Sequence, residues 1–261
     1  MFPVLIEIGG FKFATYGLLV ASGYLLAIWW LTTERERMGL DEDTFWSLIY
    51  TLFFGAIGGG KLLYFIIEWR SLLDGSLHLI RDIRFGFVFF GGLLGACLTG
   101  FWWVRKHKTD FMKIGDYFGV ALPMGHAVGR LGCFAAGCCA GRPTTLPWGV
   151  HFSHPESLVP ASLRSIPLHP TQLYESAMVA IAAFIALKTI RKVQAGKLPT
   201  GSAFAVYIGL YSLTRFANEF LRGDDRGGFF LGMSPSQWIS LVVACWAIWI
   251  FQQRRSAAEA L

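Results

Sequence analysis

The residues best suited to chemistry in this sequence are arginines that stand inside apolar stretches. Arg130 lies about five turns into an apolar segment that begins near Ile114, where only Asp116 and His126 precede it as charged or ionisable residues. Burying a guanidinium in lipid costs at least a few kcal/mol, so an unpaired and idle arginine is not expected there. Because a guanidinium binds phosphate through two parallel hydrogen bonds, Arg130 predicts an anionic, lipid-borne substrate.

A second arginine pattern lies in the apolar segment at about 201–221. Four polar residues follow one another at intervals of four, four and three and therefore share one helix face: Tyr211, Arg215, Glu219 and Arg222. Arg215 and Arg222 would lie about 10 Å apart along the axis. Two arginines against one carboxylate leave an excess positive charge, which favours an anionic partner. The alternative is a ladder of salt bridges between helices that only stabilises the bundle.

The residues around Arg130 add two further features. His126 lies one turn before Arg130 on the same face; it is either a base, if unprotonated, or a buried histidine bonded to a neighbouring helix. The run that leads to Arg142 is rich in glycine, which permits close helix packing or a broken helix end whose amides face a ligand: Gly129, Gly132, Gly137 and Gly141.

The five cysteines do not match a known metal pattern. Cys97 and Cys245 lie in the middle of apolar segments and are typical of small core residues. Cys133, Cys138 and Cys139 lack paired CxxC spacing and have no histidine at finger spacing, so no metal site is predicted. They are interpreted as structural residues, with a disulfide on the outer side as the alternative. The motifs GxSxG and HExxH, the P-loop and the dinucleotide fingerprint are absent.

The elements that position these residues are apolar helices. Of 261 residues, 54% are hydrophobic and only 15% charged, against about 25% charged in soluble domains. The sequence therefore predicts an all-α, polytopic integral membrane protein, a single domain over 1–261. Seven segments are long enough to span a membrane: 14–32, 45–67, 85–104, 114–134, 170–189, 201–221 and 235–252. The first has no signal-peptide cleavage pattern, and the outward-facing loop at about 135–169 is too short to bury its own core.

The distribution of basic residues sets the expected orientation. The net charge of +6 does not indicate nucleic-acid binding, because twelve basic residues cluster on one side of a seven-helix arrangement: Arg35, Arg37, Arg105, Lys106, Lys108, Lys113, Lys188, Arg191, Lys192, Lys197, Arg254 and Arg255. Basic residues in short loops mark the cytoplasmic side. We therefore expect the amino terminus outside and the carboxyl terminus in the cytoplasm.

With this orientation, the unusual polar residues fall in the outer half of the membrane. They come from several segments: Tyr16, Lys61, His126, Arg130, His169, Gln172, Tyr174, Glu175, Tyr211, Arg215, Glu219 and Arg222. Scattered structural polar residues are not expected to segregate in this way. The sequence predicts a single outward-facing site.

Three ordered motifs also carry a family resemblance. GRLGCF…GRP, IPLHPTQLYES and TRFANEFLRGDD resemble the prolipoprotein diacylglyceryl transferases, bacterial inner-membrane enzymes of lipoprotein maturation, and the resemblance runs from Tyr16-Gly17 to the last helix. It implies seven transmembrane helices, a periplasmic amino terminus and an active site towards the periplasm. The implied reaction moves the diacylglyceryl group of phosphatidylglycerol to the lipobox cysteine of a preprolipoprotein, forms a thioether and releases glycerol phosphate.

The resemblance also implies roles for single residues. Arg130 matches the arginine of the GRxGNF signature, which is associated with phosphatidylglycerol binding, and Arg215 matches the essential arginine of the penultimate helix. We expect catalytic roles for Arg215, His126 and Tyr16, and supporting roles for His169, Gln172 and Glu175. Phosphatidylglycerol binding is assigned to Arg130, Gly141, Arg142, Tyr211, Glu219 and Arg222. Membrane lipids are the other expected partners, and no cofactor is expected.

The chain departs from the family pattern at three positions. Phe90 stands where many members have a histidine proposed to be catalytic, Cys133 replaces the asparagine of GRxGNF, and Cys138 replaces an acidic residue. The substrate thiol has an unperturbed pKa of about 8.5. It would then lose its proton to His126 or His169, or it would ionise directly because the positive field of the arginines favours the thiolate. The rival function is a transporter or flippase of an anionic lipid or metabolite. That function is disfavoured by the lack of an internal repeat and by the one-sided polar cluster.

Overall fold

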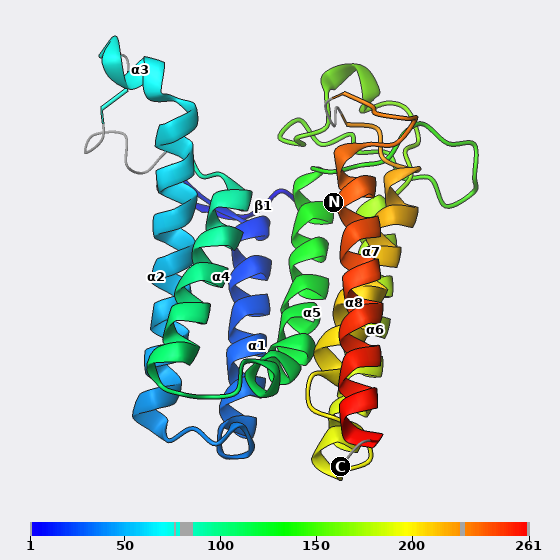
Figure 1. Cartoon of the computed structure of the whole chain (residues 1–261). Coiled ribbons are helices and arrows are strands. Elements are labelled where there is room, and N and C mark those ends of the chain that lie inside the picture. The colour runs from blue at the N-terminus through cyan, green and yellow to red at the C-terminus, as the bar shows by residue number, and fades with distance from the viewer. Residues whose placement is uncertain (1, 76, 79–85, 225–227, 260–261) are drawn as a thin grey trace. The chain divides into compact units, whose positions relative to one another are not determined.

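The computed structural model of the chain describes residues 2–75, 77–78, 86–224 and 228–259 (Figure 1). Its contacts divide into two compact units, one formed by 1–34 and 115–261 and the other by 35–114. The expected single domain remains a prediction.

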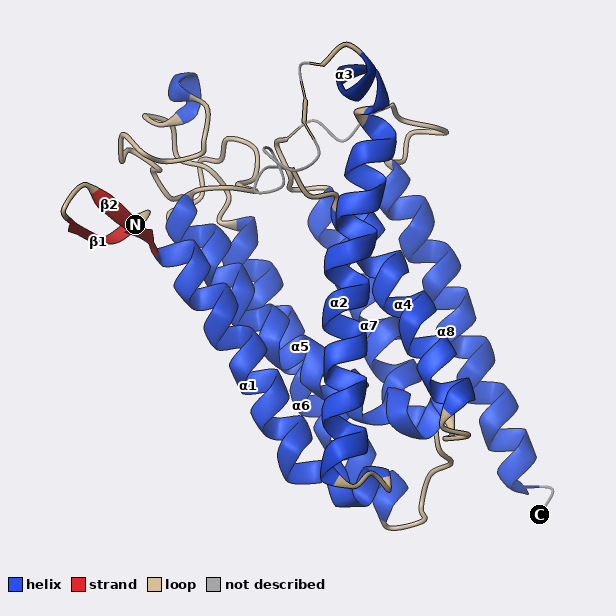
Figure 2. Cartoon of the chain, turned by 90° about the vertical axis from the view of Figure 1, so that its left-hand side faces the viewer, coloured by secondary structure: helices blue, strands red, loops and turns tan. Residues whose placement is uncertain are grey.

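The smaller unit is built on two long helices that pack through glycine. These are α2 (Glu42–Ile67) and α4 (Phe89–Lys106), which lie side by side in Figure 2, with the short α3 (Trp69–Leu73) following α2. A Cβ built on Gly59 would lie 2.3 Å from the Gly91 carbonyl oxygen, and one on Gly95 would lie 2.2 Å from that of Gly55. The two GxxxG pairs therefore let the two backbones touch, as in many membrane helix pairs.

The larger unit contains the other long helices. They are α1 (Thr15–Met38, up to Glu34), α5 (Phe111–Ala136, from Gly115), α6 (Thr171–Gln194), α7 (Ser202–Glu219) and α8 (Pro235–Glu259). Helices α6, α7 and α8 pack together in that order. A Cβ built on Gly23 would lie 2.5 Å from the Gly125 carbonyl oxygen, so α1 and α5 are also in backbone contact.

Buried charges fix one end of this helix group. The Asp116 carboxylate accepts hydrogen bonds from the backbone N–H groups of Gly201, Ala203 and Phe204 at 2.7–3.0 Å, and so caps the start of α7 from a different helix. Arg191 near the end of α6 donates to both carboxylate oxygens of Glu34 at 2.8 and 3.1 Å. These contacts join α5 to α7 and α1 to α6.

Two features outside the helices were not expected from the sequence. The chain begins with an antiparallel hairpin of β1 (Val4–Ile8) and β2 (Phe11–Ala14), joined by two glycines with positive φ. The segment 137–170, which contains the one-turn η1 (Ala161–Leu163), buries a small apolar cluster of Phe152, Val159 and Leu168. Phe134 of α5 packs against this cluster, so the loop forms a core that it shares with the helix end rather than none.

The predicted apolar segments each overlap a long helix, and the all-α, membrane-embedded character is confirmed. Four helices in the described part of the chain are long and apolar enough to cross a membrane: α1, α2, α6 and residues Pro235–Arg254 of α8. Many of their large apolar side chains are exposed, among them Leu25, Phe54 and Trp249. Such an apolar surface is expected where helices contact lipid. The number of seven spans and the orientation stay predictions.

Candidate active site

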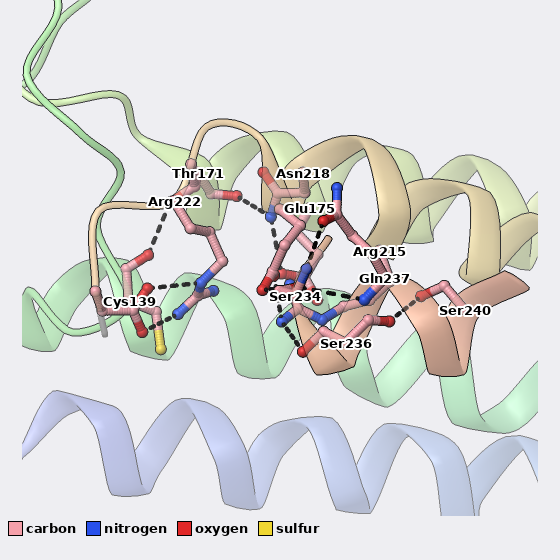
Figure 3. Close-up of polar contacts among 12 residues, drawn as sticks. Cys139, Thr171, Glu175, Arg215, Asn218, Arg222, Ser234, Ser236, Gln237 and Ser240 are labelled. Atoms are coloured by element: carbon pink, nitrogen blue, oxygen red, sulfur yellow. Dashed lines mark hydrogen bonds and ion pairs between the residues drawn. The ribbon is translucent and has the colours of Figure 1, made fainter. Parts of the chain in front are cut away.

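The larger unit contains a polar cluster built around a fully buried carboxylate. Glu175, in the second turn of α6, is 0% exposed and receives Arg130 Nη2 at 2.7 Å on Oε1. Its other oxygen accepts a hydrogen bond from Asn218 Nδ2 at 3.1 Å, as Figure 3 shows. Burial of a carboxylate is costly unless charge and hydrogen bonds compensate it. Glu175 therefore ties together α5, α6 and α7.

His126 contacts both Arg130 and Glu175 in this cluster. Arg130 Nε donates to His126 Nε2 at 3.2 Å, and that nitrogen lies 3.5 Å from Glu175 Oε1. An N–H of Arg130 thus points at the histidine lone pair that a base would use. The His126 ring also packs on the Tyr211 ring of α7, with centroids 5.4 Å apart. His126 and Arg130 thus lie on one face of α5, as their spacing predicted, while the catalytic role of His126 stays a prediction.

A second guanidinium lies at the contact between α7 and α8. Arg215 Nη2 forms an ion pair with Glu219 Oε2 at 2.6 Å and donates to Ser236 Oγ at 3.1 Å. Glu219 Oε1 accepts a hydrogen bond from Ser234 Oγ at 2.8 Å. Arg215 Nη1 is buried and has no hydrogen-bond partner among the described residues, although buried donors are rarely left unpaired. This unused N–H group is a ready site for an anionic oxygen.

Arg222 does not lie on the helix face that the spacing predicted. Because α7 ends at Glu219, the chain turns and Arg222 pairs as an isolated bridge with Gly141. Its guanidinium binds both carboxylate oxygens of Asp224, at 2.8 and 2.9 Å. Burial opposes its charge, but Asp224 and the Cys139 thiol raise the pKa of Arg222. The expected excess of positive charge is therefore wrong at this position, since Asp224 neutralises it.

Gly141 is a contact point between the loop and two helices. Its N–H donates to the His169 carbonyl at 2.9 Å, and a Cβ built there would lie 2.5 Å from the Leu221 carbonyl oxygen and 2.6 Å from His169 Cβ. Arg142 contributes its backbone N–H to the same Leu221 carbonyl, but its side chain is exposed and lies outside the buried cluster. Burial, and then the charge of Arg142, lower the pKa of His169.

Three thiols and a tyrosine border the cluster. The sulfur atoms of Cys133, Cys138 and Cys139 all lie within 4.8 Å of one another, and Arg130 Nη1 is 3.8 Å from Cys133 Sγ. Tyr16 at the start of α1 is 44% exposed and lies over Gly132, where a built Cβ would be 3.4 Å from its Cδ2. Spacing rules missed this proximity because a helix end, not a CxxC turn, brings the thiols together.

Some residues that contact the polar cluster were not singled out in the sequence. Asn218, Ser234 and Ser236 bind the carboxylates and the guanidinium of the cluster but are small polar residues without a motif of their own. Asn218 is three residues after Arg215, on the side of α7 that meets α6, which a helical projection would have indicated. Gln172 Nε2 donates to the Cys138 carbonyl at 2.7 Å. Gln172 therefore holds the loop after α5, and its expected supporting role stays a prediction.

Comparisons with known proteins show the family of the chain. Residues 3–252 match the family model of prolipoprotein diacylglyceryl transferase. A phosphatidylglycerol–prolipoprotein diacylglyceryl transferase of Clostridium tetani is 36% identical over 251 residues, which are 96% of this chain and 97% of the relative. Enzymes of the same name from Clostridium perfringens and Pseudoalteromonas atlantica are 32% and 29% identical, over 95% and 97% of this chain and 93% and 90% of the relatives. The chain therefore belongs to the prolipoprotein diacylglyceryl transferase family.

Proposed function

We propose that this chain transfers the diacylglyceryl group of phosphatidylglycerol to the lipobox cysteine of prolipoproteins, and that the cluster around Glu175 is its active site. The carrying observation is the set of guanidinium groups, buried in an apolar helix group, beside a partly buried patch of thiols. The reaction forms a carbon–sulfur bond, breaks the glycerol carbon–oxygen bond and releases glycerol phosphate. Such a site must bind a phosphodiester and stabilise the phosphate as it leaves.

Arg130 is the proposed headgroup ligand. Its contacts with Glu175, His126 and Cys133 use one donor on each of its three nitrogens, whereas a guanidinium has five N–H donors. Glu175 therefore neutralises the charge that burial would penalise and orients the guanidinium of Arg130. Other N–H donors of this guanidinium remain for phosphate oxygens. A lysine ammonium cannot form this bidentate contact.

Arg215 is the proposed stabiliser of the leaving phosphate. Its Nη1 donors are buried and unused, and Glu219 and Ser236 hold the other side of the guanidinium. Preorganised donors of this kind act where negative charge develops and are worth about 10²–10³-fold in rate for each donor. Tyr211, whose ring packs on that of His126, is proposed to contact the phosphate as well.

The proton of the substrate thiol has three possible routes in this chain. Phe90 provides no base, and its side chain is exposed at the start of α4. His126 accepts the proton once a bound phosphate draws Arg130 Nε away from its lone pair. His169 is the second candidate, and burial and the charge of Arg142 lower its pKa. The third route is direct ionisation of the thiol in the field of the arginines.

The proposed setting is the bacterial inner membrane, with seven membrane helices, a periplasmic amino terminus and a cytoplasmic carboxyl terminus. In support, the cluster residues lie at one end of the larger unit, from the starts of α1 and α6 and the ends of α5 and α7. This end would face the periplasm, where lipobox cysteines are modified. Gly141 and Arg142 would then border the entrance for lipid or peptide.

The function is tested by incubating the purified chain with phosphatidylglycerol and a lipobox peptide and measuring the mass of the peptide. We expect the mass of one diacylglyceryl adduct and release of glycerol phosphate. A peptide with serine in place of the lipobox cysteine is the control and should gain no mass. Absence of the adduct, together with movement of labelled phosphatidylglycerol between the leaflets of proteoliposomes, would replace the transferase by the transporter.

A further inference from the structure

The cluster of cysteine thiols is the feature that the proposed function leaves without a role. Cys133, Cys138 and Cys139 are all partly buried and carry free thiols, and their sulfur atoms lie within 4.8 Å of one another. Partial burial means that one side of the group is open. A cluster of three thiols on such a short stretch calls for a chemical explanation, because small apolar residues would pack equally well.

The backbone of this stretch is arranged to bring the thiols together. Gly137 ends α5 with a φ of 75°, and the N–H of Cys138 returns to the Cys133 carbonyl at 3.1 Å. Cys139 has a φ of 61°, which is costly for a residue with a side chain and persists only where other contacts impose it. Those contacts come from the first turn of α6.

The first turn of α6 holds both loop cysteines by their carbonyl groups. Thr171 Oγ1 donates to the Cys139 carbonyl and Gln172 Nε2 to the Cys138 carbonyl, both at 2.7 Å; Figure 3 shows the contact of Thr171 with Cys139. The Cys138 thiol donates to the Cys133 carbonyl at 3.7 Å, and the three sulfur atoms remain within 4.8 Å of one another. The turn is fixed before any ligand binds.

Three convergent thiols with an open side are the donor set of a catalytic zinc site. Each Zn–S bond is about 2.3 Å long, so sulfurs on one tetrahedral zinc lie about 3.8 Å apart. The observed separations of up to 4.8 Å require a contraction of about 1 Å at most, within the range of a cysteine rotamer adjustment. Catalytic zinc sites keep three protein ligands and leave the fourth position to water or substrate.

We propose that Cys133, Cys138 and Cys139 bind one Zn²⁺ and that its fourth position takes the lipobox cysteine as a thiolate. This inference rests on the proposed function and assigns the step for which Phe90 provides no base. A thiol that coordinates zinc is deprotonated outright, and its proton passes to solvent. His126 can then keep its contact with Arg130 during the reaction.

The position of the thiols suits the transfer. Arg130 Nη1 is 3.8 Å from Cys133 Sγ, so the guanidinium that would bind the phosphate borders the zinc site. The zinc-bound sulfur attacks the glycerol carbon that carries the phosphate oxygen; the new C–S bond takes the electron pair of the thiolate, and the C–O pair leaves with glycerol phosphate. Zinc does not change its oxidation state, and the thioether product, a weaker ligand than a thiolate, dissociates from it.

Metal content gives the first part of the test. The full chain is purified under reducing conditions, equilibrated with Zn²⁺, passed over a desalting column and analysed for metal and for free thiols. We expect one zinc per chain, with loss of the metal in Cys138→Ser and Cys139→Ser. Cys97→Ser and Cys245→Ser are matched controls from α4 and α8 and should keep it. Absence of zinc from the wild-type chain, or a disulfide within the cluster under these conditions, would overturn the proposal.

Cobalt substitution tests the open position without relying on any variant. Co²⁺ bound by three thiolates gives a charge-transfer absorption, and a lipobox peptide should intensify and shift it, whereas the peptide with serine in place of cysteine should not. An unchanged spectrum with the cysteine peptide would overturn the proposal. Transfer at the full rate by a chelated, zinc-free chain would overturn it too while leaving the transferase function intact. Failure of the zinc-loaded wild type to form any adduct would instead count against the function itself.

Discussion

At the scale of single residues, three guanidinium groups of the polar cluster each meet a carboxylate. The pairs are Arg130–Glu175, Arg215–Glu219 and Arg222–Asp224. Charges in an apolar interior need such partners, and removing one partner alone typically costs about 3–5 kcal/mol. A carboxylate uses only part of the donor set of an arginine. The same pairs can therefore stabilise the fold and present N–H groups to a phosphate.

Substitution of Arg130 should separate these two roles. We expect Arg130→Ala to abolish transfer and Arg130→Lys to retain a small fraction, because a lysine cannot form the bidentate contact. Arg191→Ala is the matched control, since Arg191 also forms an ion pair with a buried glutamate between helices but lies at the other end of α6. It should lower the melting temperature while transfer per folded molecule stays normal. Near-normal turnover by Arg130→Ala at matched abundance would rule out the headgroup role.

The base hypothesis for His126 makes a prediction about pH. Glutamine can still accept the hydrogen bond from Arg130 Nε but cannot take up a proton, so His126→Gln should slow transfer by about 10²–10⁴-fold with little change in lipid binding. The deficit should shrink as pH rises towards the thiol pKa of about 8.5, where the substrate is already thiolate. His107→Gln, in the smaller unit, is the control. Normal turnover by His126→Gln at neutral pH would make His126 a packing residue and would favour His169, the arginine field or the zinc site.

At the scale of elements, the site depends on the junction where the loop after α5 meets the start of α6 and the end of α7. Gly141 lies in this junction, bridged to Arg222 and bonded to His169. Any side chain here would push the Leu221 backbone away and with it the segment that carries Arg222. The elements are thus positioned by close backbone approach rather than by side-chain packing alone.

A methyl group at Gly141 should therefore disturb the site. The Cβ of Gly141→Ala would lie 2.5 Å from the Leu221 carbonyl oxygen and 2.8 Å from Thr171 Cγ2, and overpacking of this kind costs about 1–3 kcal/mol. We expect reduced transfer and a lower melting temperature. Gly129→Ala is the control, because nothing lies within 4 Å of a Cβ built there and alanine favours a helix. Equal behaviour of the two variants would contradict the role of the junction.

The sequence predicted the helices well and their ends less well. Long apolar runs located each long helix of the described residues, since lipid exposure and packing both select apolar residues. Arg222 was placed on α7 because its spacing from Arg215 and Glu219 fits a helix, but α7 stops at Glu219, where the loop offers other backbone partners. The β1–β2 hairpin was overlooked, although Gly9-Gly10 between two short apolar runs is a known hairpin signal.

At the scale of the whole molecule, the residues of the polar cluster all belong to one of the two units. The buried cluster, the thiols and Tyr16 all belong to the larger unit, whereas Lys61 and Phe90 belong to the smaller one. Charge patterning along the sequence predicted that the polar residues gather at one end. It could not predict the pairs, because Arg130 and Glu175 are 45 residues apart and several carboxylates were equally available in the sequence.

The central claim is that the buried guanidiniums bind and stabilise the phosphate rather than only hold the helices together. The most direct measurement is the transfer rate per folded molecule of Arg215→Ala, with the melting temperature taken on the same preparation. Because Arg215 Nη1 is buried and has no partner in the described part of the chain, we predict a loss of about 10²–10³-fold in rate. A smaller loss is expected for Glu219→Gln, which removes only the charge that positions the arginine. A lower melting temperature with an unchanged rate per folded molecule would contradict the account and leave Arg215 as a structural salt bridge.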